Sequence, residues 1–407
     1  MPLPKRSWAS AACGVWVAGA LAVTGCGETA SEPAPGAELT VYVSLPLRGP
    51  LAADGRDAAD GARLALAEAD REAAGFAVRA ELIDDTEGSS RDALASPAEA
   101  SANARAASED STAIAYIGEL TSGATRASLP VTNEARMLQV SPGAGAVDLV
   151  SEFRGTDEVP SAQPRGERSF GRVIPADDLQ AGAAAAWARK LDTRRVLALH
   201  DGSAYGRALT ESFEQAALEI GFEVERGELP HARQPLSGRG ELVFYAGSPE
   251  PGAGELVAAA EMAGARTVIG TDAILDPRFS ADLPAASPSR PLGAPELLAT
   301  SGALDPTQLP VRADDFVTRF RARFGRAPGR FAAYGYEAMA VVLDSIERAD
   351  DPADREAVSA AFFATEERDS ILGTYSITEL GEPTLDRFTG YRLTGGHWRP
   401  EAELFAP

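Results

Sequence analysis

The 407-residue chain contains few lysines, histidines and cysteines. Its two lysines, Lys5 and Lys190, leave arginine to carry nearly all of the positive charge. Acidic residues outnumber basic ones and give a formal net charge of −22. This balance disfavours binding to nucleic acid and adsorption to anionic lipid, because both carry negative charge. It places no restriction on a small ligand held in a cleft.

Motifs typical of enzymes are also missing. The three histidines, His200, His231 and His397, lie far apart and lack metal-ligand spacing. The sequence has no Gly-x-Ser-x-Gly elbow, no Walker loop and no Gly-x-Gly-x-x-Gly motif after its first predicted strand. We therefore expect a protein that is not an enzyme, with no catalytic residue, no metal and no cofactor.

The N-terminus has the pattern of an export signal. A basic start at residues 5–6 precedes an apolar stretch at 8–23, which is short for a membrane span. The stretch ends in VTGC and resembles a bacterial lipobox, in which Cys26 is lipidated and becomes the first residue. We expect residues 1–25 to be a signal peptide and 26–37 a flexible lipidated tether. An ordinary secretion signal or an uncleaved anchor is the alternative.

Cleavage before Cys26 would remove Cys13 and leave a single cysteine. An intramolecular disulfide would then be impossible, and we expect no cysteine-based metal site or catalytic thiol. The remaining chain has no long apolar run, and a diacylglyceryl group has the two acyl chains that stable anchoring requires. We expect an extracytoplasmic protein, anchored to the outer face of the cytoplasmic membrane.

From residue 38 onward, strand and helix patterns alternate, which predicts parallel sheets with helices on both faces. The first set comprises predicted strands at 38–47, 76–85, 112–118 and 136–142, and predicted helices at 60–75, 96–110 and 124–135. After a polar surface loop at 151–168 and a crossing segment at 169–178, the second set comprises strands at 194–201, 222–229, 241–247 and 266–272, and helices at 179–191, 206–221 and 254–264. The C-terminal part adds helices at 314–325 and 335–348, and strands at 371–378 and 388–398.

Two α/β sets of similar build predict two Rossmann-like lobes joined by hinge crossings, with a cleft between them. We expect the first lobe to comprise 38–176 plus 301–385 and the second to comprise 177–300 plus 386–407. Ligands bind beyond the carboxyl ends of strands in open parallel sheets. The strand exits of this chain are rich in Gly, Ser, Asp and Tyr, as in IGELTSG, SPGAG, HDGSAYG and GTDA. This concentration predicts a binding cleft at the strand exits.

The ordered series of these segments resembles the periplasmic-binding-protein type I family. The resemblance covers about residues 38–400 of the chain. The segments that carry it are SLPLRGPLAADG, IGELTSGATRASLPV, MLQVSPGAG, FGRVIPADDLQAG, VLALHDGSAYGRAL, FYAGS, TVIGTDA and YGYEAM. Within the family, the chain is most similar to the branch that serves ABC importers of branched-chain amino acids. The resemblance implies a two-lobed α/β fold that captures an amino acid or a related small polar ligand by hinge closure.

The resemblance also implies roles for individual residues. Ser122 matches the serine that holds the ligand carboxylate, where free N–H groups begin a helix. Gly143 matches a residue whose carbonyl binds the ligand ammonium, and Asp272 stands where the family often has an acidic partner for it. Tyr205 matches an aromatic residue that closes over the ligand. Thr121, Asp54, Asp177 and Tyr336 are further residues predicted to lie near the cleft.

Three positions depart from the family pattern. Gly145 replaces a threonine, so only its backbone contact with the ligand survives. Ser248 replaces an aromatic wall residue, and Asp54 replaces another near the first strand. The predicted loop at 230–240 is also shorter than the family's usual helix. These differences predict a pocket that is wider and more polar than a leucine site.

Each predicted site residue also has a purely structural interpretation. Ser122 could be a plain helix N-cap, and Asp177 could cap the helix that follows the crossing. Asp272 could form a turn, whereas Tyr205 and Tyr336 could simply pack in the interior.

Three functions agree with these observations. We favour the solute-binding component of an ABC importer, a monomer whose closed form is recognised by a membrane permease. A ligand-sensing module for a membrane receptor and a degenerate surface lipoprotein without a transport role are the alternatives.

Overall fold

The structure is a computed structural model that describes residues 38–88, 94–151, 160–229, 240–250, 252–280 and 293–407. The predicted signal and tether, including Cys26, lie outside these described residues, as does nearly all of the predicted loop at 230–240. The described residues belong to one compact unit, Pro33–Pro407. None of the helices in these residues is long and apolar enough to cross a membrane.

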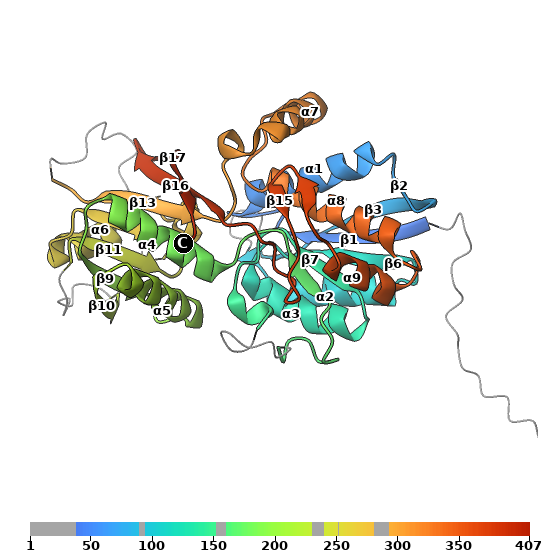
Figure 1. Cartoon of the computed structure of the whole chain (residues 1–407), viewed down its shortest axis with the longest axis horizontal. Helices are drawn as coiled ribbons and strands as arrows, with labels where there is room; N and C mark the ends of the chain where they lie inside the picture. Colours follow the sequence, from blue (N-terminus) through green and yellow to red (C-terminus); the bar gives the residue numbers. More distant parts are fainter. Residues whose placement is uncertain (1–37, 89–93, 152–159, 230–239, 251, 281–292) are drawn as a thin grey trace, which may run out of the picture. The chain divides into compact units, whose positions relative to one another are not determined.

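The first sheet has the strand order β2-β3-β1-β6-β7-β8 (Figure 1). Its strands are β1 (Glu38–Leu45), β2 (Glu72–Ala73), β3 (Phe76–Asp84), β6 (Ala113–Ile117), β7 (Leu138–Ser141) and β8 (Phe170–Arg172). All neighbours pair in parallel except β2, which is antiparallel to β3. The associated helices are α1 (Ala52–Glu68), α2 (Pro97–Glu109), α3 (Ser122–Glu134), α7 (Asp314–Phe324), α8 (Ala332–Arg348) and α9 (Arg355–Phe363). Two short hairpins add β4 (Thr86–Glu87) with β5 (Leu94–Ala95), and β14 (Arg368–Ser370) with β15 (Gly373–Tyr375).

The second sheet has the strand order β10-β9-β11-β12-β13-β16-β17. Its strands are β9 (Arg195–His200), β10 (Glu223–Glu228), β11 (Leu242–Ala246), β12 (Thr267–Gly270), β13 (Glu296–Ser301), β16 (Arg387–Thr394) and β17 (His397–Phe405). The first five are parallel, whereas β16 and β17 extend the edge in antiparallel pairing. The second sheet is associated with α4 (Asp177–Lys190), α5 (Ala204–Glu219) and α6 (Ala253–Ala263). Four 3₁₀ turns lie at η1 (Val147–Leu149), η2 (Asp272–Leu275), η3 (Pro306–Gln308) and η4 (Val311–Ala313).

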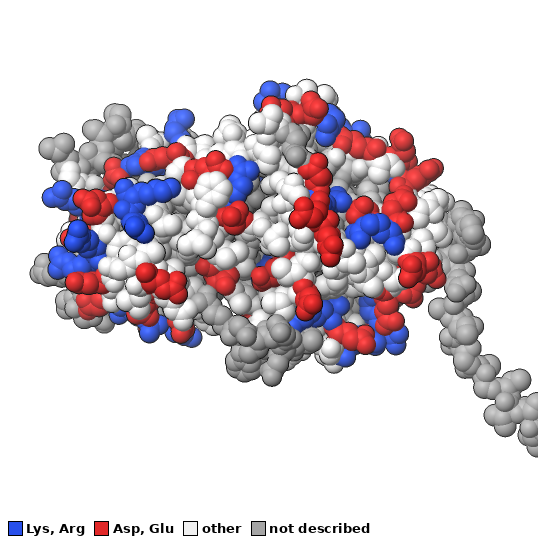
Figure 2. Space-filling view, viewed as in Figure 1, with Lys and Arg blue, Asp and Glu red and all other residues white. Residues whose placement is uncertain are grey.

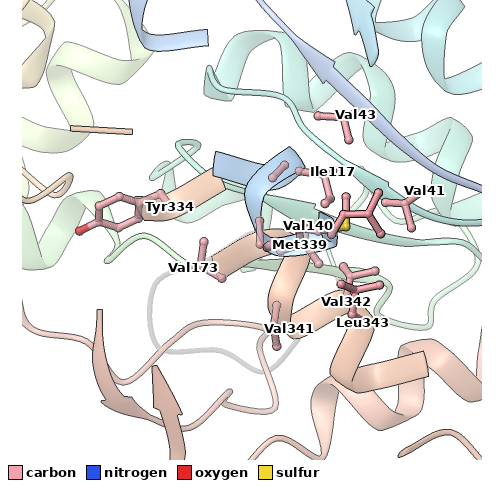
Figure 3. Close-up of a cluster of buried hydrophobic side chains, with 14 of the residues drawn as sticks. Val41, Val43, Ile117, Val140, Val173, Tyr334, Met339, Val341, Val342 and Leu343 are labelled. Atoms are coloured by element: carbon pink, nitrogen blue, oxygen red, sulfur yellow. The ribbon is translucent and has the colours of Figure 1, made fainter. Parts of the chain in front are cut away.

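The core of the first half lies between its sheet and the pair α1 and α8. Side chains of β1, β6 and β7, such as Val41, Ile117 and Val140, pack in one cluster with Met339 and Val342 of α8 (Figure 3). Continuous apolar runs of this kind are expected for parallel strands that are covered on both faces. The prediction of an α/β fold with two parallel sheets is confirmed.

The chain passes from the first sheet to the second between β8 and α4, returns after β13, and passes again before β16. Hydrogen bonds hold these crossings together. Tyr334 of α8 donates from its hydroxyl to the Gly302 carbonyl at 2.7 Å and accepts from the Leu304 N–H at 3.0 Å. Gln180 of α4 donates to the Thr300 carbonyl at 2.9 Å, which ties the first crossing to the second.

The start of α1 differs from the prediction. The helix runs from Ala52 to Glu68 and is followed by β2, whereas the sequence pattern predicts a helix at 60–75. Gly55 lies in the missed first turns of the helix, and glycine disfavours helix interiors. Gly55 and Gly61 are both required by close packing: a Cβ at Gly55 would overlap the Pro46 carbonyl, and one at Gly61 the Ala332 carbonyl. Tertiary contact therefore outweighs local propensity here.

Other elements match or extend the predictions. Helix α2 begins as expected, with Pro97 in its first turn and the Ser96 hydroxyl accepting from the Glu99 N–H at 3.4 Å. Helix α3 continues through Pro130 and ends at Glu134, close to the end of the predicted range 124–135. Strand β13 and helix α9 were not predicted. In the structure, β13 lies between β12, to which it is parallel, and β16, to which it is antiparallel.

Candidate functional site

The first turn of α3 uses two neighbouring hydroxyls in different ways. Thr121 has extended backbone angles and is the N-cap, and its Oγ1 accepts from the Ala124 N–H at 3.4 Å. Ser122 is therefore the first helical residue and not the cap. Its Oγ accepts from the Ala146 N–H at 3.2 Å, which connects α3 to the segment after β7. A hydroxyl that accepts in this way still has its own proton to donate.

The segment after β7 is held by Ser141. The Ser141 hydroxyl accepts from the N–H groups of Gly143 at 3.2 Å and Ala144 at 2.8 Å, and donates to the Glu119 carbonyl at 2.6 Å. A Cβ at Gly143 would collide with the Leu120 carbonyl. Glycine at 143 thus lets this segment lie directly against the exit of β6.

Asp177 begins α4 and lies against Gly145. The Asp177 N–H donates to the Gly145 carbonyl at 2.9 Å, and a Cβ on residue 145 would overlap Oδ1 of Asp177. The N-cap position of α4 is Ala176, with no side-chain capping bond, so the capping interpretation of Asp177 is wrong. Burial above all, and the charge of Asp272 next, raise the pKa of Asp177 to about 7.

These elements enclose a cavity of about 420 Å³. Residues from the helices and loops associated with both sheets line it: Leu51, Asp54, Leu120, Thr121, Ser122, Gly123, Arg126, Gly143, Gly145, Asp177, Tyr205, Pro249, Asp272, Ala273, Asp276, Arg278, Arg330 and Phe331. Eight of the ten residues predicted to bind ligand or to lie near the cleft are among them. The strand exits that the sequence singled out thus meet at one cavity.

Tyr205 and Asp272 lie on the side of the second sheet. The Tyr205 hydroxyl lies 3.4 Å from Oγ1 of Thr271, the residue that follows β12. Burial raises the pKa of Asp272, whereas the positive charge of Arg330 and a hydrogen bond from Gln180 act in the opposite direction. Asp272 begins the 3₁₀ turn η2, so its backbone also has the predicted turn role.

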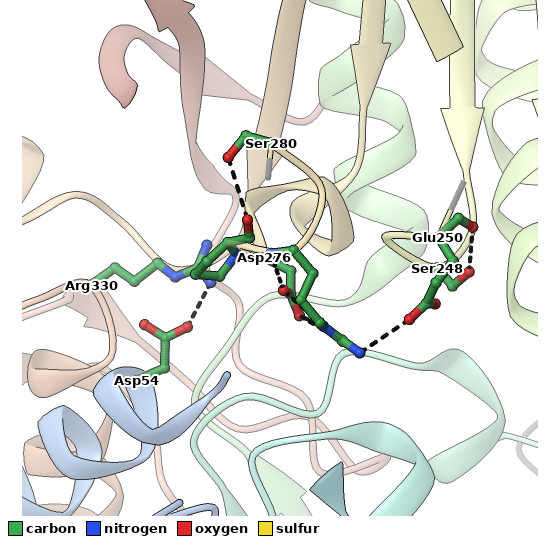
Figure 4. Close-up of polar contacts among 8 residues, drawn as sticks. Asp54, Ser248, Glu250, Asp276, Ser280 and Arg330 are labelled. Carbon is green, nitrogen blue, oxygen red and sulfur yellow. Dashed lines mark hydrogen bonds and ion pairs between the residues drawn. The ribbon is translucent and has the colours of Figure 1, made fainter. Parts of the chain in front are cut away.

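Three arginines that the sequence did not single out also line the cavity. Arg330, just before α8, forms an ion pair with Asp54 at 2.7 Å (Figure 4). Its guanidinium lies 5.0 Å from the centre of the Phe331 ring. Arg126 binds Asp148 through two contacts of 2.6 Å. These arginines carried no signal in a sequence where arginine supplies almost every cation. The partner of Arg330 lies far away in the chain, and that of Arg126 lies 22 residues away.

The third arginine, Arg278, forms an ion pair with Asp276 at 2.7 Å. The interspersion of acidic and basic side chains continues on the molecular surface (Figure 2). In the described part of the chain, no group of three or more His, Cys, Asp or Glu is arranged to hold a metal ion.

Two of the predicted residues do not line this cavity. Ser248 turns toward its own loop, where its hydroxyl donates to the Glu250 carbonyl at 2.9 Å (Figure 4) and its N–H donates to Asp201 at 2.8 Å. Tyr336 lies on α8 away from the cavity, and its hydroxyl donates to Glu68 of α1 at 2.8 Å. The packing interpretation of Tyr336 therefore agrees with the structure.

The sequence of this chain is similar to those of known solute-binding proteins. The family model described as "Periplasmic binding protein" matches residues 38–238. A Leu/Ile/Val-binding protein of Rhizobium johnstonii, BraC3, is 27% identical over 387 residues, which cover 90% of this chain and 95% of that protein.

Solved structures share the fold. A leucine-binding protein of Thermotoga maritima, LivK, superimposes with a TM-score of 0.69 at 22% identity, covering 90% of this chain and 99% of the other. LivJ of Streptococcus pneumoniae, solved with isoleucine, gives 0.68 at 20% identity, with 91% and 100% covered. A solute-binding protein of Rhodopseudomonas palustris, solved with 3,4-dihydroxybenzoic acid, gives 0.64 at 18% identity, with 91% and 98% covered.

The same fold thus holds chemically different ligands, and the fold by itself identifies none of them. The family match, the two parallel sheets and the cavity at their strand exits lead to one conclusion. This chain has the fold of the type I periplasmic binding proteins, and its residues 38–238 match the periplasmic binding protein family model.

Proposed function

We propose that this protein is the extracytoplasmic solute-binding component of an ABC importer. In this proposal it captures an amino acid or a related small polar ligand between its two lobes, and a membrane permease recognises the closed form. The match of residues 38–238 to the periplasmic binding protein family supports the extracytoplasmic location and the transport role. The Leu/Ile/Val-binding protein of Rhizobium johnstonii supports an amino acid as the ligand.

One observation carries the proposal. Hydroxyl, carbonyl and carboxylate groups from the helices and loops associated with both sheets line a single cavity. The ligand carboxylate would lie at the first turn of α3, whose N–H groups have no acceptor within the helix and whose dipole favours an anion. The Ser122 hydroxyl would donate to it. The ligand ammonium would lie between the Gly143 carbonyl and Asp272, with Tyr205 and the Gly145 backbone completing the wall.

We further propose that Cys26 carries a lipid anchor, that the protein works as a monomer without a cofactor, and that it catalyses no reaction. The predicted lobe boundaries, 38–176 plus 301–385 and 177–300 plus 386–407, are part of the same proposal. The lipobox pattern before Cys26 supports the anchor, and the family's role in solute binding supports the absence of catalysis.

The test is a thermal-shift screen of the purified residues 26–407 against the twenty amino acids, short amides and aromatic acids, followed by calorimetry on every hit. A stoichiometric amino acid complex whose affinity is lost on amidation of the ligand carboxylate is the expected result. A screen in which no amino acid or amide shifts the melting temperature would contradict the proposal.

A further inference from the structure

The carboxylate of Asp177 has no partner among the described residues. Asp177 is only 8% exposed, and it lines the cavity. No hydrogen bond or ion pair to its carboxylate is present in the part of the chain that the structure describes, although its N–H is bound to Gly145. By contrast, the cavity residues Asp54 and Asp276 each have an arginine partner. Asp177 therefore differs from Asp54 and Asp276, and also from Asp272, which receives a hydrogen bond from Gln180.

The two nearest cations are already bound to other groups. Arg172 is fully buried, forms an ion pair with Glu382 and donates to the carbonyls of Ala144 and Ala146 at 3.2 and 2.8 Å. Arg126 is held by the two contacts with Asp148 described above. Both guanidinium groups attract the carboxylate of Asp177 electrostatically without a hydrogen bond to it. Each forms its ion pair with another carboxylate, Arg172 with Glu382 and Arg126 with Asp148.

The position of this carboxylate depends on Gly145. Any side chain at 145 would occupy the place of the Asp177 Oδ1 atom. Glycine at this position therefore removes the hydroxyl that the family resemblance led us to expect, and a carboxylate occupies the space instead. Where the resemblance led us to expect a neutral threonine hydroxyl, this chain has the carboxylate of Asp177.

A buried carboxylate without a partner is unfavourable, because it has lost its hydration without compensation. Burial and the charge of Asp272 accordingly raise the pKa of Asp177 to about 7. A single ligand ammonium brings one positive charge to a cavity that contains both Asp177 and Asp272. If this ammonium lies at Asp272, where the charge of Arg330 and a hydrogen bond from Gln180 also act, the carboxylate of Asp177 remains without a directly bound cation.

We propose that Asp177 binds a second cationic nitrogen of the ligand, which makes the substrate class α-amino acids with a basic side chain. The inference rests on the proposed function, because the carboxylate seat at Ser122 and the ammonium position at Asp272 are taken from it. Asp177 is thus the residue that determines ligand specificity. The pocket that is wider and more polar than a leucine site then matches a longer, charged side chain.

Calorimetry at pH 8 with L-lysine, L-ornithine, L-norleucine and L-leucine tests this inference. L-Norleucine has the carbon chain of lysine without its side-chain amine. A charge-assisted bond of the strength typical in proteins predicts that L-lysine or L-ornithine binds about ten- to a hundredfold more tightly than L-norleucine. Binding of L-norleucine or L-leucine as tight as that of both basic ligands overturns the inference and leaves the proposed function standing. Failure of all four ligands overturns the inference, whereas failure of the whole screen contradicts the proposed function.

A pair of isosteric variants assigns the preference to one carboxylate. Asp177→Asn should abolish the preference for the basic ligand while L-norleucine still binds. Asp178→Asn, one residue later in the same helical turn, removes the same charge and should keep the preference. A preference that persists in Asp177→Asn overturns the assignment. Circular dichroism checks that both variants fold, and the ligand comparison on the unmodified protein is decisive even if one does not.

Discussion

At the scale of the residue, the first turn of α3 gives different tasks to two adjacent hydroxyls. Thr121 caps the helix through the Ala124 N–H, and Ser122 accepts from the Ala146 N–H. The cap stabilises the helix, whereas the proton of Ser122 is available to a ligand. This division permits a test in which stability and affinity respond to different substitutions.

We predict that Ser122→Ala lowers the affinity for an amino acid ligand by about ten- to a hundredfold, because a charge-assisted hydrogen bond to the carboxylate is lost. The measurement is calorimetry with the free acid and with its carboxamide. The amide should bind the unmodified protein weakly, and the substitution should change its affinity much less. Equal losses for acid and amide would show that Ser122 does not contact the carboxylate.

Thr121→Ala is the matched comparison. Loss of an N-cap typically costs about 1 kcal/mol of stability. Ser122→Ala also leaves the Ala146 N–H without its acceptor, so its melting temperature should fall as well. The acid-to-amide comparison is therefore the measurement that separates the two residues, because Thr121→Ala should leave the ratio of the two affinities unchanged.

At the scale of the element, a buried network joins β6, α3 and β7 directly behind the site. Glu119 is fully buried and accepts from the hydroxyls of Tyr116 at 2.6 Å and Ser128 at 2.5 Å. Gln139 of β7 donates to the same carboxylate at 3.3 Å. Burial outweighs these hydrogen bonds and raises the pKa of Glu119 to about 8.

This raised pKa predicts a pH dependence of stability. The usual pKa of the glutamate side chain is 4.5, so the folded state holds the proton more tightly than the unfolded state between about pH 4.5 and 8. The free energy of unfolding should therefore decrease as the pH rises through this window, by at most about 1.4 kcal/mol per pH unit for one group. Asp85, whose pKa burial raises to about 7, acts in the same direction.

Glu119→Gln should make this pH dependence shallower, because the amide does not titrate in this range. Urea unfolding at several pH values between 5 and 8.5 provides the measurement. Glu109→Gln, at the exposed end of α2, is the control and should keep the slope of the unmodified protein. An unchanged slope in Glu119→Gln would mean that this carboxyl is not the group that titrates.

At the scale of the whole molecule, the chain crosses between the two sheets at segments tied by Tyr334 and Gln180. A ligand that contacts the cavity residues beside both sheets stabilises the conformation in which all of those contacts are made. Short crossings that absorb changes in φ and ψ are the usual hinges of such a closure.

We predict that saturating ligand decreases the radius of gyration measured by X-ray scattering. The ligand is the tightest hit of the screen. The Ser122→Ala variant at the same ligand concentration should show a smaller decrease, because less of it is bound. A radius that does not change when calorimetry shows saturation would mean that the ligand binds one lobe without closure.

The second whole-molecule prediction concerns membrane attachment. Mass spectrometry of the native protein should find a diacylglyceryl group on Cys26 as the first residue, since the VTGC junction follows a short apolar stretch. Cys26→Ser should release the protein or leave the precursor uncleaved. A mature N-terminus elsewhere, without lipid, would rule out the anchor.

Local patterns in the sequence were sufficient for most elements of the fold. Apolar runs such as Ala113–Ile117 mark buried parallel strands, and Ser96 with Pro97 marks the start of α2, because these signals depend on neighbours in the chain. The concentration of small and polar residues at the strand exits also located the cavity. The early start of α1 escaped the prediction, because Gly55 in its first turns is explained only by its contact with Pro46.

The composition and sequence pattern by themselves determined the α/β class, the order of the elements and the small polar strand exits, whereas the resemblance to a family singled out Ser122, Gly143, Tyr205 and Asp272 among them. Only the tertiary structure decided which hydroxyl caps α3, that Arg330 pairs with Asp54, and that Asp177 occupies the space beside Gly145. The physical reason is the range of the interactions. Strand and helix signals act within a few residues, whereas ion pairs and steric fit join groups that are distant in the chain and meet only after folding.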